Sequence, residues 1–234
     1  MGADTLEYHY KFTFPDGSAQ DFCVRLDARS LRIRDEVGSD PPGWTRLGCC
    51  QCPNCPLSED VHPFCPVAKS LVGVIDFFKD RLSIETVSLE VSTEARAYRR
   101  DTPLAKGVSS LIGLHMVTSG CPILGKLKPM VRIHLPFPML PETHYRMLAM
   151  YMLAQHFRMT KGKEPDWELK GLIPMLNEIR DVNMSFCSRL KAICPEDASL
   201  NAVIRLDCFA DSSSVQVEDE RLDLISESFD AYLS

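Results

Sequence analysis

The sequence lacks several features that would place it in a large functional class. Of its 234 residues, 26 are lysine or arginine and 32 are aspartate or glutamate, which gives a net charge of -6. A general nucleic-acid binder needs an excess of cations to contact phosphates, so this composition predicts no nucleic-acid partner. Walker loops and G-x-G-x-x-G, H-E-x-x-H and G-x-S-x-G motifs are also absent.

Long apolar runs are lacking as well. No segment approaches the roughly 20 apolar residues that a membrane-spanning helix needs, and the opening MGADTLEYHYKF has neither the basic start nor the apolar stretch of a secretory signal. These absences predict a soluble cytoplasmic protein without a membrane partner. Hydrophobic residues make up 45% of the chain, which is enough to bury a core without disulfides or metal.

Strand-like patterns dominate the first part of the chain and helical patterns the rest. Alternation predicts strands over 7–14, 20–26, 87–98 and 129–135, with a turn from Pro15 to Ser18 between the first two. Apolar periodicity predicts helices over 67–82, 105–117 and 142–159, and within 167–193 and 218–233. One face of the 142–159 helix carries Tyr145, Leu148, Ala149, Met152, Leu153, His156 and Phe157.

This order predicts an α+β fold, because strands and helices do not alternate as in a Rossmann-like sheet. We expect an N-terminal β-hairpin or small sheet with a cysteine-rich metal loop, packed against several helices, and a mostly helical C-terminal half. Residues 1–234 are interpreted as a single domain whose cysteine-rich loop covers 48–66. The alternative is a division into a β-rich part, 1–100, and a mainly helical part, 101–234.

Ten cysteines stand out against these absences. In a reducing compartment they indicate metal ligands or redox thiols rather than a disulfide framework. Five cluster in one loop: Cys49, Cys50, Cys52, Cys55 and Cys65. The other five are scattered: Cys23, Cys121, Cys187, Cys194 and Cys208. We expect the scattered ones, Cys121 excepted, to be small buried side chains.

Two ligand spacings overlap in the loop. Cys52 and Cys55 form a C-x2-C pair and His62 with Cys65 an H-x2-C pair, which together predict a Cys3His site of the kind that zinc prefers. Alternatively, Cys49, Cys52 and Cys55 form C-x2-C-x2-C, which resembles the spacing, though not the family, of bacterial ferredoxin loops that bind a [4Fe-4S] cluster. Cys65 or Cys121 would then be the fourth ligand. Whether Cys49 or Cys50 is a ligand stays open.

Proline follows half of the cysteines, far more often than chance predicts. These cysteines are Cys52, Cys55, Cys65, Cys121 and Cys194. Proline restricts φ and stiffens the chain around a ligand, so the pattern favours cysteines held in ordered loops over cysteines in flexible segments. Pro66 also predicts that Cys65 occupies the N-cap of a helix, where the positive helix end would favour its thiolate.

A second candidate site lies in a basic segment. From Glu94 to His134 the chain has seven lysines or arginines and two acids. Cys121 as a nucleophile, with His115 or His134 as its base, could form a catalytic site there. The simpler interpretation is a partly buried histidine on a helix and a solvated basic surface.

Three functions therefore remain open. The first is a metal-binding protein in which zinc in a Cys3His loop serves a structural, sensing or interaction purpose and presents the loop to a protein partner. The second is an iron–sulfur or thiol redox protein that uses Cys49, Cys52, Cys55 and either Cys65 or Cys121. The third is a metal- or cysteine-dependent enzyme. The sequence predicts neither the substrate nor the oligomeric state.

Overall fold

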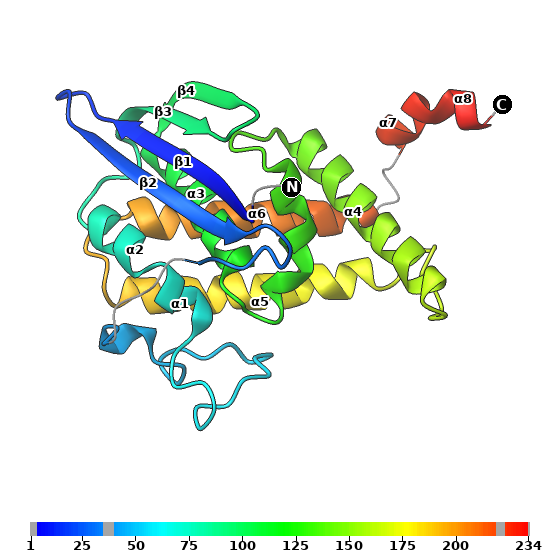
Figure 1. Cartoon of the computed structure of the whole chain (residues 1–234), viewed down its shortest axis with the longest axis horizontal. Coiled ribbons are helices and arrows are strands. Elements are labelled where there is room, and N and C mark those ends of the chain that lie inside the picture. The colour runs from blue at the N-terminus through cyan, green and yellow to red at the C-terminus, as the bar shows by residue number, and fades with distance from the viewer. Residues whose placement is uncertain (1–3, 35–39, 219–222, 234) are drawn as a thin grey trace.

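The computed structural model describes residues 4–34, 40–218 and 223–233, and its fold is α+β (Figure 1). Four antiparallel strands form one sheet in the order β2-β1-β3-β4. Their bounds are β1 (Thr5–Thr13), β2 (Ala19–Asp27), β3 (Thr86–Ser92) and β4 (Ala97–Pro103). Among the described residues, no helix has both the length and the apolar content needed to cross a membrane.

The predicted N-terminal hairpin is confirmed. Tyr8, Tyr10 and Phe12 alternate along β1 and are buried on one face of the sheet, as period-two patterning requires. The turn needs Gly17, whose φ of 83° is unfavourable for a residue with a side chain. Residues 87–98, predicted as one strand, instead contain most of β3 and the start of β4, with a tight turn at 93–96 between them.

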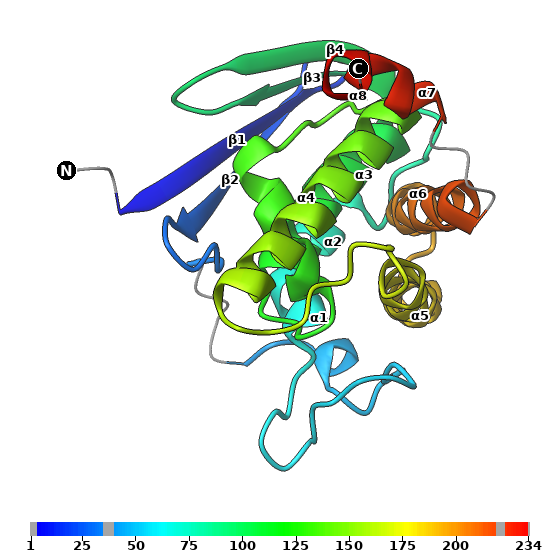
Figure 2. The same cartoon turned by 90° about the vertical axis from the view of Figure 1, so that its right-hand side faces the viewer.

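Helices cover the buried face of the sheet in two layers, as Figure 2 shows. The inner layer contains α3 (Leu104–Thr118), and the outer layer contains α5 (Leu172–Lys191) and α6 (Ala198–Glu218) side by side. Gly107 lets α3 approach the sheet, because a Cβ there would lie 2.9 Å from Leu89 Cδ2. Across α3, a Cβ on Gly113 would lie 3.2 Å from Leu206 Cδ2 of α6.

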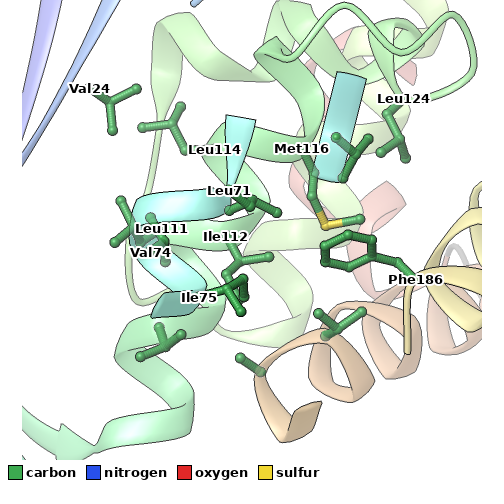
Figure 3. Close-up of a cluster of buried hydrophobic side chains, with 14 of the residues drawn as sticks. Val24, Leu71, Val74, Ile75, Leu111, Ile112, Leu114, Met116, Leu124 and Phe186 are labelled. Atoms are coloured by element: carbon green, nitrogen blue, oxygen red, sulfur yellow. The ribbon is translucent and has the colours of Figure 1, made fainter. Parts of the chain in front are cut away.

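Side chains from distant parts of the sequence meet in the core (Figure 3). Leu71, Val74 and Ile75 come from the short helices α1 (Pro66–Ser70) and α2 (Val72–Phe78) and the residue between them. They pack with Ile112 of α3 and Phe186 of α5. The predicted 67–82 helix is therefore two helices, separated at Leu71, whose φ and ψ are -102° and 0°.

The remaining helical segments differ from their predictions in specific ways. Residues 129–135, predicted as a strand, lie mostly in the 3-10 helix η2 (Leu124–Ile133), because Pro129 cannot donate to a strand ladder. The prediction of α4 (Leu140–Thr160) is confirmed, but most of its named apolar face is exposed. Within 218–233 the described helices are short: α7 (Asp223–Ser226), η3 (Glu227–Phe229) and α8 (Asp230–Leu233).

Candidate metal centre

The cysteine loop is closed at its base by the backbone and by α5. The loop follows the 3-10 helix η1 (Gly43–Thr45). Leu47 N donates to Pro63 O at 3.0 Å and Cys65 N donates to Thr45 O at 2.8 Å. The guanidinium of Arg189, from α5, donates to the carbonyls of Trp44, Arg46 and Leu47. In Figures 1 and 2 the closed loop lies below α1 and α5, away from the sheet.

The tip of the loop is also held against α5. Cys55 N donates to Cys52 O at 3.0 Å, which makes a tight turn of the C-x2-C pair. The side-chain amide of Asn54, inside this turn, donates to the Glu178 carbonyl at 2.9 Å. Since hydrogen bonds fasten both the base and the tip of the loop to α5, the cysteines of the turn have a defined position relative to the core.

Five cysteines line one small cavity of about 20 Å³, and one of them, Cys50, is exposed. The other four, Cys52, Cys55, Cys65 and Cys121, come from three parts of the chain, and we call the space between them the four-cysteine cavity. Cys65 is the N-cap of α1 with Pro66 at N1, as predicted. Cys121 follows the C-terminal end of α3, so the packing of α1 against α3 brings it to the loop. The other walls are mainly apolar, with Ile123, Val182 and Phe186 among them, and they also include the cationic side chain of Arg189.

Burial and neighbouring thiols govern the electrostatics of the four-cysteine cavity. Burial, together with the nearby thiols of Cys65, Cys55 and Cys121, raises the pKa of Cys52 to about 11, although a hydrogen bond with the Ser185 side chain lowers it. Burial also raises the pKa of Cys121, whereas the backbone N–H groups of Leu124 and Ile123 directed at its sulfur lower it. Thiols in this position disfavour a free charge, and a cation among them would stabilise their thiolates.

Two of the predicted ligands lie outside this arrangement. His62 is exposed and does not line the four-cysteine cavity. Cys49 is half-buried, and it too is absent from the cavity wall. Cys50 does line the wall, but it is exposed, and its φ of 53° turns it towards Cys49, whose thiol is its side-chain partner. The structure thus brings together Cys52, Cys55 and Cys65 of the predicted set.

The sulfur atoms of the four-cysteine cavity are spread apart. Among the described residues, one group of at least three cysteine, histidine or acidic side chains has its ligand atoms all within 4.8 Å of one another. This group consists of Glu7, His9 and Cys23 on the first hairpin. Any three sulfurs of the four-cysteine cavity therefore include a pair separated by more than 4.8 Å. Around one tetrahedral zinc ion, Zn–S bonds of about 2.3 Å would place the sulfurs about 3.8 Å apart.

The hairpin group was missed at the sequence level because its residues lie on two strands. His9 Nε2 lies 3.3 Å from Glu7 Oε2 and 4.0 Å from Cys23 Sγ. Glu7 is already paired with Arg25 at 3.3 Å, and both Glu7 and His9 are exposed. The strand register places Cys23 opposite His9, a signal that could have predicted the group once the hairpin was recognised.

The histidines proposed as bases for Cys121 lie elsewhere. His134 accepts from or donates to the Tyr10 hydroxyl at 2.5 Å and lines a larger cavity on the other side of η2. His115 is buried on α3 and bonds the backbone of Ser70. Burial lowers the pKa of His134 to about 3 and that of His115 to about 4. Both histidines are therefore neutral, His115 in the buried core and His134 half-buried at the wall of the larger cavity.

The scattered cysteines are less buried than predicted. Cys187 is buried, in agreement with the prediction, whereas Cys23 and Cys194 are half-buried and Cys208 is exposed. The prediction is wrong for Cys208 because it lies on an outward position of α6, a helix that the apolar pattern did not reveal.

Comparison with known proteins assigns the chain to a family. Neither the curated proteins nor the solved structures contain a match to it. A family model covers residues 8–230, which include most of β1, the other three strands and most of the helices described above. The match spans the four-cysteine cavity as well as the sheet. The chain belongs to the family described as Domain of unknown function (DUF6901).

Proposed function

We propose that this chain is an iron–sulfur protein whose cluster is bound by the thiolates of the four-cysteine cavity. The observation that carries the proposal is the convergence of Cys121 with the three loop cysteines. Each of these four cysteines is followed by proline, as is the closing ligand of ferredoxin-type loops. Together they supply the four thiolates that a [4Fe-4S] cluster requires.

The sulfur atoms of the four-cysteine cavity are further apart than those around one zinc ion, and the cavity of about 20 Å³ would have to widen to hold a cluster. A cubane cluster has its ligands at four metal corners, so its thiolates stand further apart than those around one zinc. Amide groups directed at a sulfur, as those of Leu124 and Ile123 are at Cys121, tune the potential of such clusters. When bound, the cluster would supply reversible one-electron transfer.

Zinc in the same cavity is the second candidate function. The C-x2-C turn of Cys52 and Cys55 is also a common half of structural zinc sites with four cysteine ligands, which are coordinatively closed. In that case the ion would fasten the loop to the end of α3. A variant of this zinc site is the Cys3His set, in which His62 is the fourth ligand in place of Cys121.

The test is elemental analysis with an absorption spectrum, on protein purified without air and without a metal-binding tag. We expect about four iron and four sulfide per chain and a brown colour. Cys121→Ser should lose most of the iron, whereas Cys208→Ser and His62→Ala should retain it. One zinc per chain that is lost in Cys121→Ser would establish the second candidate, and one lost only in His62→Ala would establish the Cys3His set. Equal metal content in Cys121→Ser and Cys208→Ser would sink the four-cysteine assignment.

A further inference from the structure

A second and larger cavity of about 190 Å³ lies among α3, η2, α4, α5 and α6. Figure 2 shows α3 and α4 below the sheet, with α5 and α6 beside them. One face of α3 forms a wall, from Lys106 through Ser110 and Gly113 to Val117. The opposite walls are mainly apolar and include Met147, Leu176, Ile179 and Leu206.

The charged residues of this cavity all have the same sign. Lys106, Arg146 and Arg205 line it, and none of its described lining residues is acidic. We call it the basic cavity. Glu142, the acid nearest to Arg146 along α4, accepts a hydrogen bond from Met139 N at 2.7 Å as the N-terminal cap of that helix. Glu142 still acts electrostatically on Arg146, whose pKa it raises, and Arg146 also donates to the Met130 carbonyl at 3.2 Å, but no described carboxylate lines the cavity itself.

Several polar atoms of the basic cavity have no partner in the described part of the chain. The Nε atoms of Arg146 and Arg205 are buried and lack a hydrogen-bond acceptor. Asn183 is 3% exposed and lines the cavity, and its side-chain amide makes no hydrogen bond to a described residue. Buried donors without acceptors cost free energy, and a bound ligand with acceptor atoms would recover it.

The pKa of Lys106 reflects the excess of positive charge in the basic cavity. Burial lowers its pKa, and the positive charges of Arg100 and Arg205 lower it further. Similarly, the positive charge of Arg146 adds to burial in lowering the pKa of His134, which lines the basic cavity too. Each cation thus raises the electrostatic energy of its neighbour, and an anion between them would lower it.

We propose that the basic cavity binds a small organic anion with an apolar body, of the class of medium-chain or aromatic carboxylates. The carboxylate would accept hydrogen bonds from Lys106, Arg146 and Arg205. The apolar body of the anion would lie against the apolar walls of the cavity. The volume agrees with this class, because an engineered apolar cavity of about 150 Å³ already binds benzene. The basic cavity does not depend on the four-cysteine cavity, so the failure of one proposal would leave the other unaffected.

Isothermal titration calorimetry on the full chain tests the proposal, with octanoate as the probe and 1-octanol as its neutral counterpart. We expect octanoate to bind at least tenfold more tightly than 1-octanol, because only the carboxylate pairs with the cations. Arg146→Gln and Arg205→Gln should each weaken octanoate binding about tenfold, in line with the loss of a charge-assisted hydrogen bond. Arg29→Gln, which alters an exposed arginine outside the cavity, should leave the affinity unchanged.

A cavity-filling variant keeps the test decisive if an arginine variant folds poorly. Val117→Phe places an aromatic ring in the apolar end of the basic cavity and should abolish octanoate binding. Cys121→Ser, which addresses the proposed cluster, should bind octanoate as the unaltered protein does. Equal affinities for octanoate and 1-octanol, or octanoate binding that survives Val117→Phe, would overturn the proposal. Absence of octanoate binding to the unaltered protein would overturn it as well.

Discussion

Arg189 carries a charge that is 2% exposed, and its hydrogen bonds within the described ranges go to the three carbonyls at the base of the cysteine loop rather than to an acid. A planar guanidinium can donate to several carbonyls at once, which an ammonium group does less well. Besides the backbone hydrogen bonds from Leu47 and Cys65, the base of the loop is therefore closed by a single side chain of α5. This arrangement joins the four-cysteine cavity to the helical core through hydrogen bonds that no short sequence pattern indicates.

Replacement of Arg189 should consequently weaken both the fold and the metal site. We expect Arg189→Met to lower the free energy of unfolding by about 2–4 kcal/mol, because the buried carbonyls lose a charged donor. Urea unfolding, combined with iron or zinc content, measures both effects. Lys191→Met, on the exposed side of the same helix, is the matched control and should change neither quantity. Indistinguishable unfolding curves for the two variants would contradict this role.

His115 and His134 predict how stability depends on pH. Their folded-state pKa values, about 4 and about 3, lie below the ordinary 6.5, so the unfolded chain binds more protons between pH 6.5 and about 4. Stability should therefore fall as the pH falls through this window, by up to about 1.4 kcal/mol per pH unit for each histidine.

The comparison of two variants isolates the histidine contribution. His134→Gln should flatten the slope of unfolding free energy against pH between about 6.5 and about 4, because one proton-binding group of the unfolded chain is removed. His156→Gln changes an exposed side chain of α4 and should preserve the slope. The measurement is urea unfolding at several pH values. A slope that His134→Gln leaves intact would argue against a neutral buried His134.

At the scale of elements, α4 buries a mixed polar and apolar face and exposes a more apolar one. Thr143, Met147, Tyr151 and Gln155 recur at intervals of four and are buried. On the other side, Tyr145, Leu153 and Phe157 are 50%, 54% and 54% exposed. The Tyr151 hydroxyl donates to Asp166 Oδ2 at 2.7 Å, which ties the buried face to the connection before α5. Burial, and not hydropathy, identifies the face of α4 that stabilises the fold.

Two truncations on α4 test this distinction. Met147→Ala should cost about 2–4 kcal/mol of unfolding free energy, since it leaves a space in a packed interior. Leu153→Ala should stay within about 0.5 kcal/mol, as exposed substitutions usually do. Urea midpoints at two protein concentrations provide the measurement. A large loss for Leu153→Ala that depends on concentration would show that another copy of the chain covers this face.

Local patterns predicted the elements whose partners are near in sequence. The first hairpin and α3 follow from alternation, a turn glycine and apolar periodicity, all of which act within a few residues. For α4 the period was predictable but the buried face was not, because methionine, leucine and tyrosine occur all around that helix. Helix α6 gave no clear apolar pattern, since it packs through small residues such as Ala198 and Ala202.

In the candidate site, too, the ligands that are close together in the sequence were easier to predict than the distant one. Cys52, Cys55 and Cys65 are close in sequence, and their spacing alone indicated a shared ligand site. His62 completed that set at the sequence level because it is the nearest further ligand, yet it is exposed. Cys121 comes to the loop only through the packing of α1 on α3, and the proline that follows it was the one local sign.

For the whole molecule, the core and the four-cysteine cavity contribute to the fold in different ways. Tyr10, Phe12 and Phe78 are completely buried in the core, where Phe12 of the sheet packs on Phe78 of α2 and the Tyr10 hydroxyl bonds Ser110 of α3. A chain of this size with one extensive apolar core does not depend on a metal for its stability. The loop, in contrast, contains few buried apolar side chains, and its cysteines are half-buried or exposed.

Removal of the proposed metal or cluster should therefore loosen one region and leave the rest folded. After treatment with a chelator in the absence of air, we expect faster amide hydrogen exchange in residues 46–66 and 119–125, because these segments would lose the proposed thiolate bonds that connect them. Exchange in β1 and β3, which form the centre of the sheet, should stay slow. Hydrogen exchange followed by mass spectrometry resolves the two regions, and Cys121→Ser purified without metal should reproduce the treated protein. Faster exchange throughout the sheet would mean that the metal stabilises the whole fold, and unchanged exchange in both cysteine segments would place the metal elsewhere.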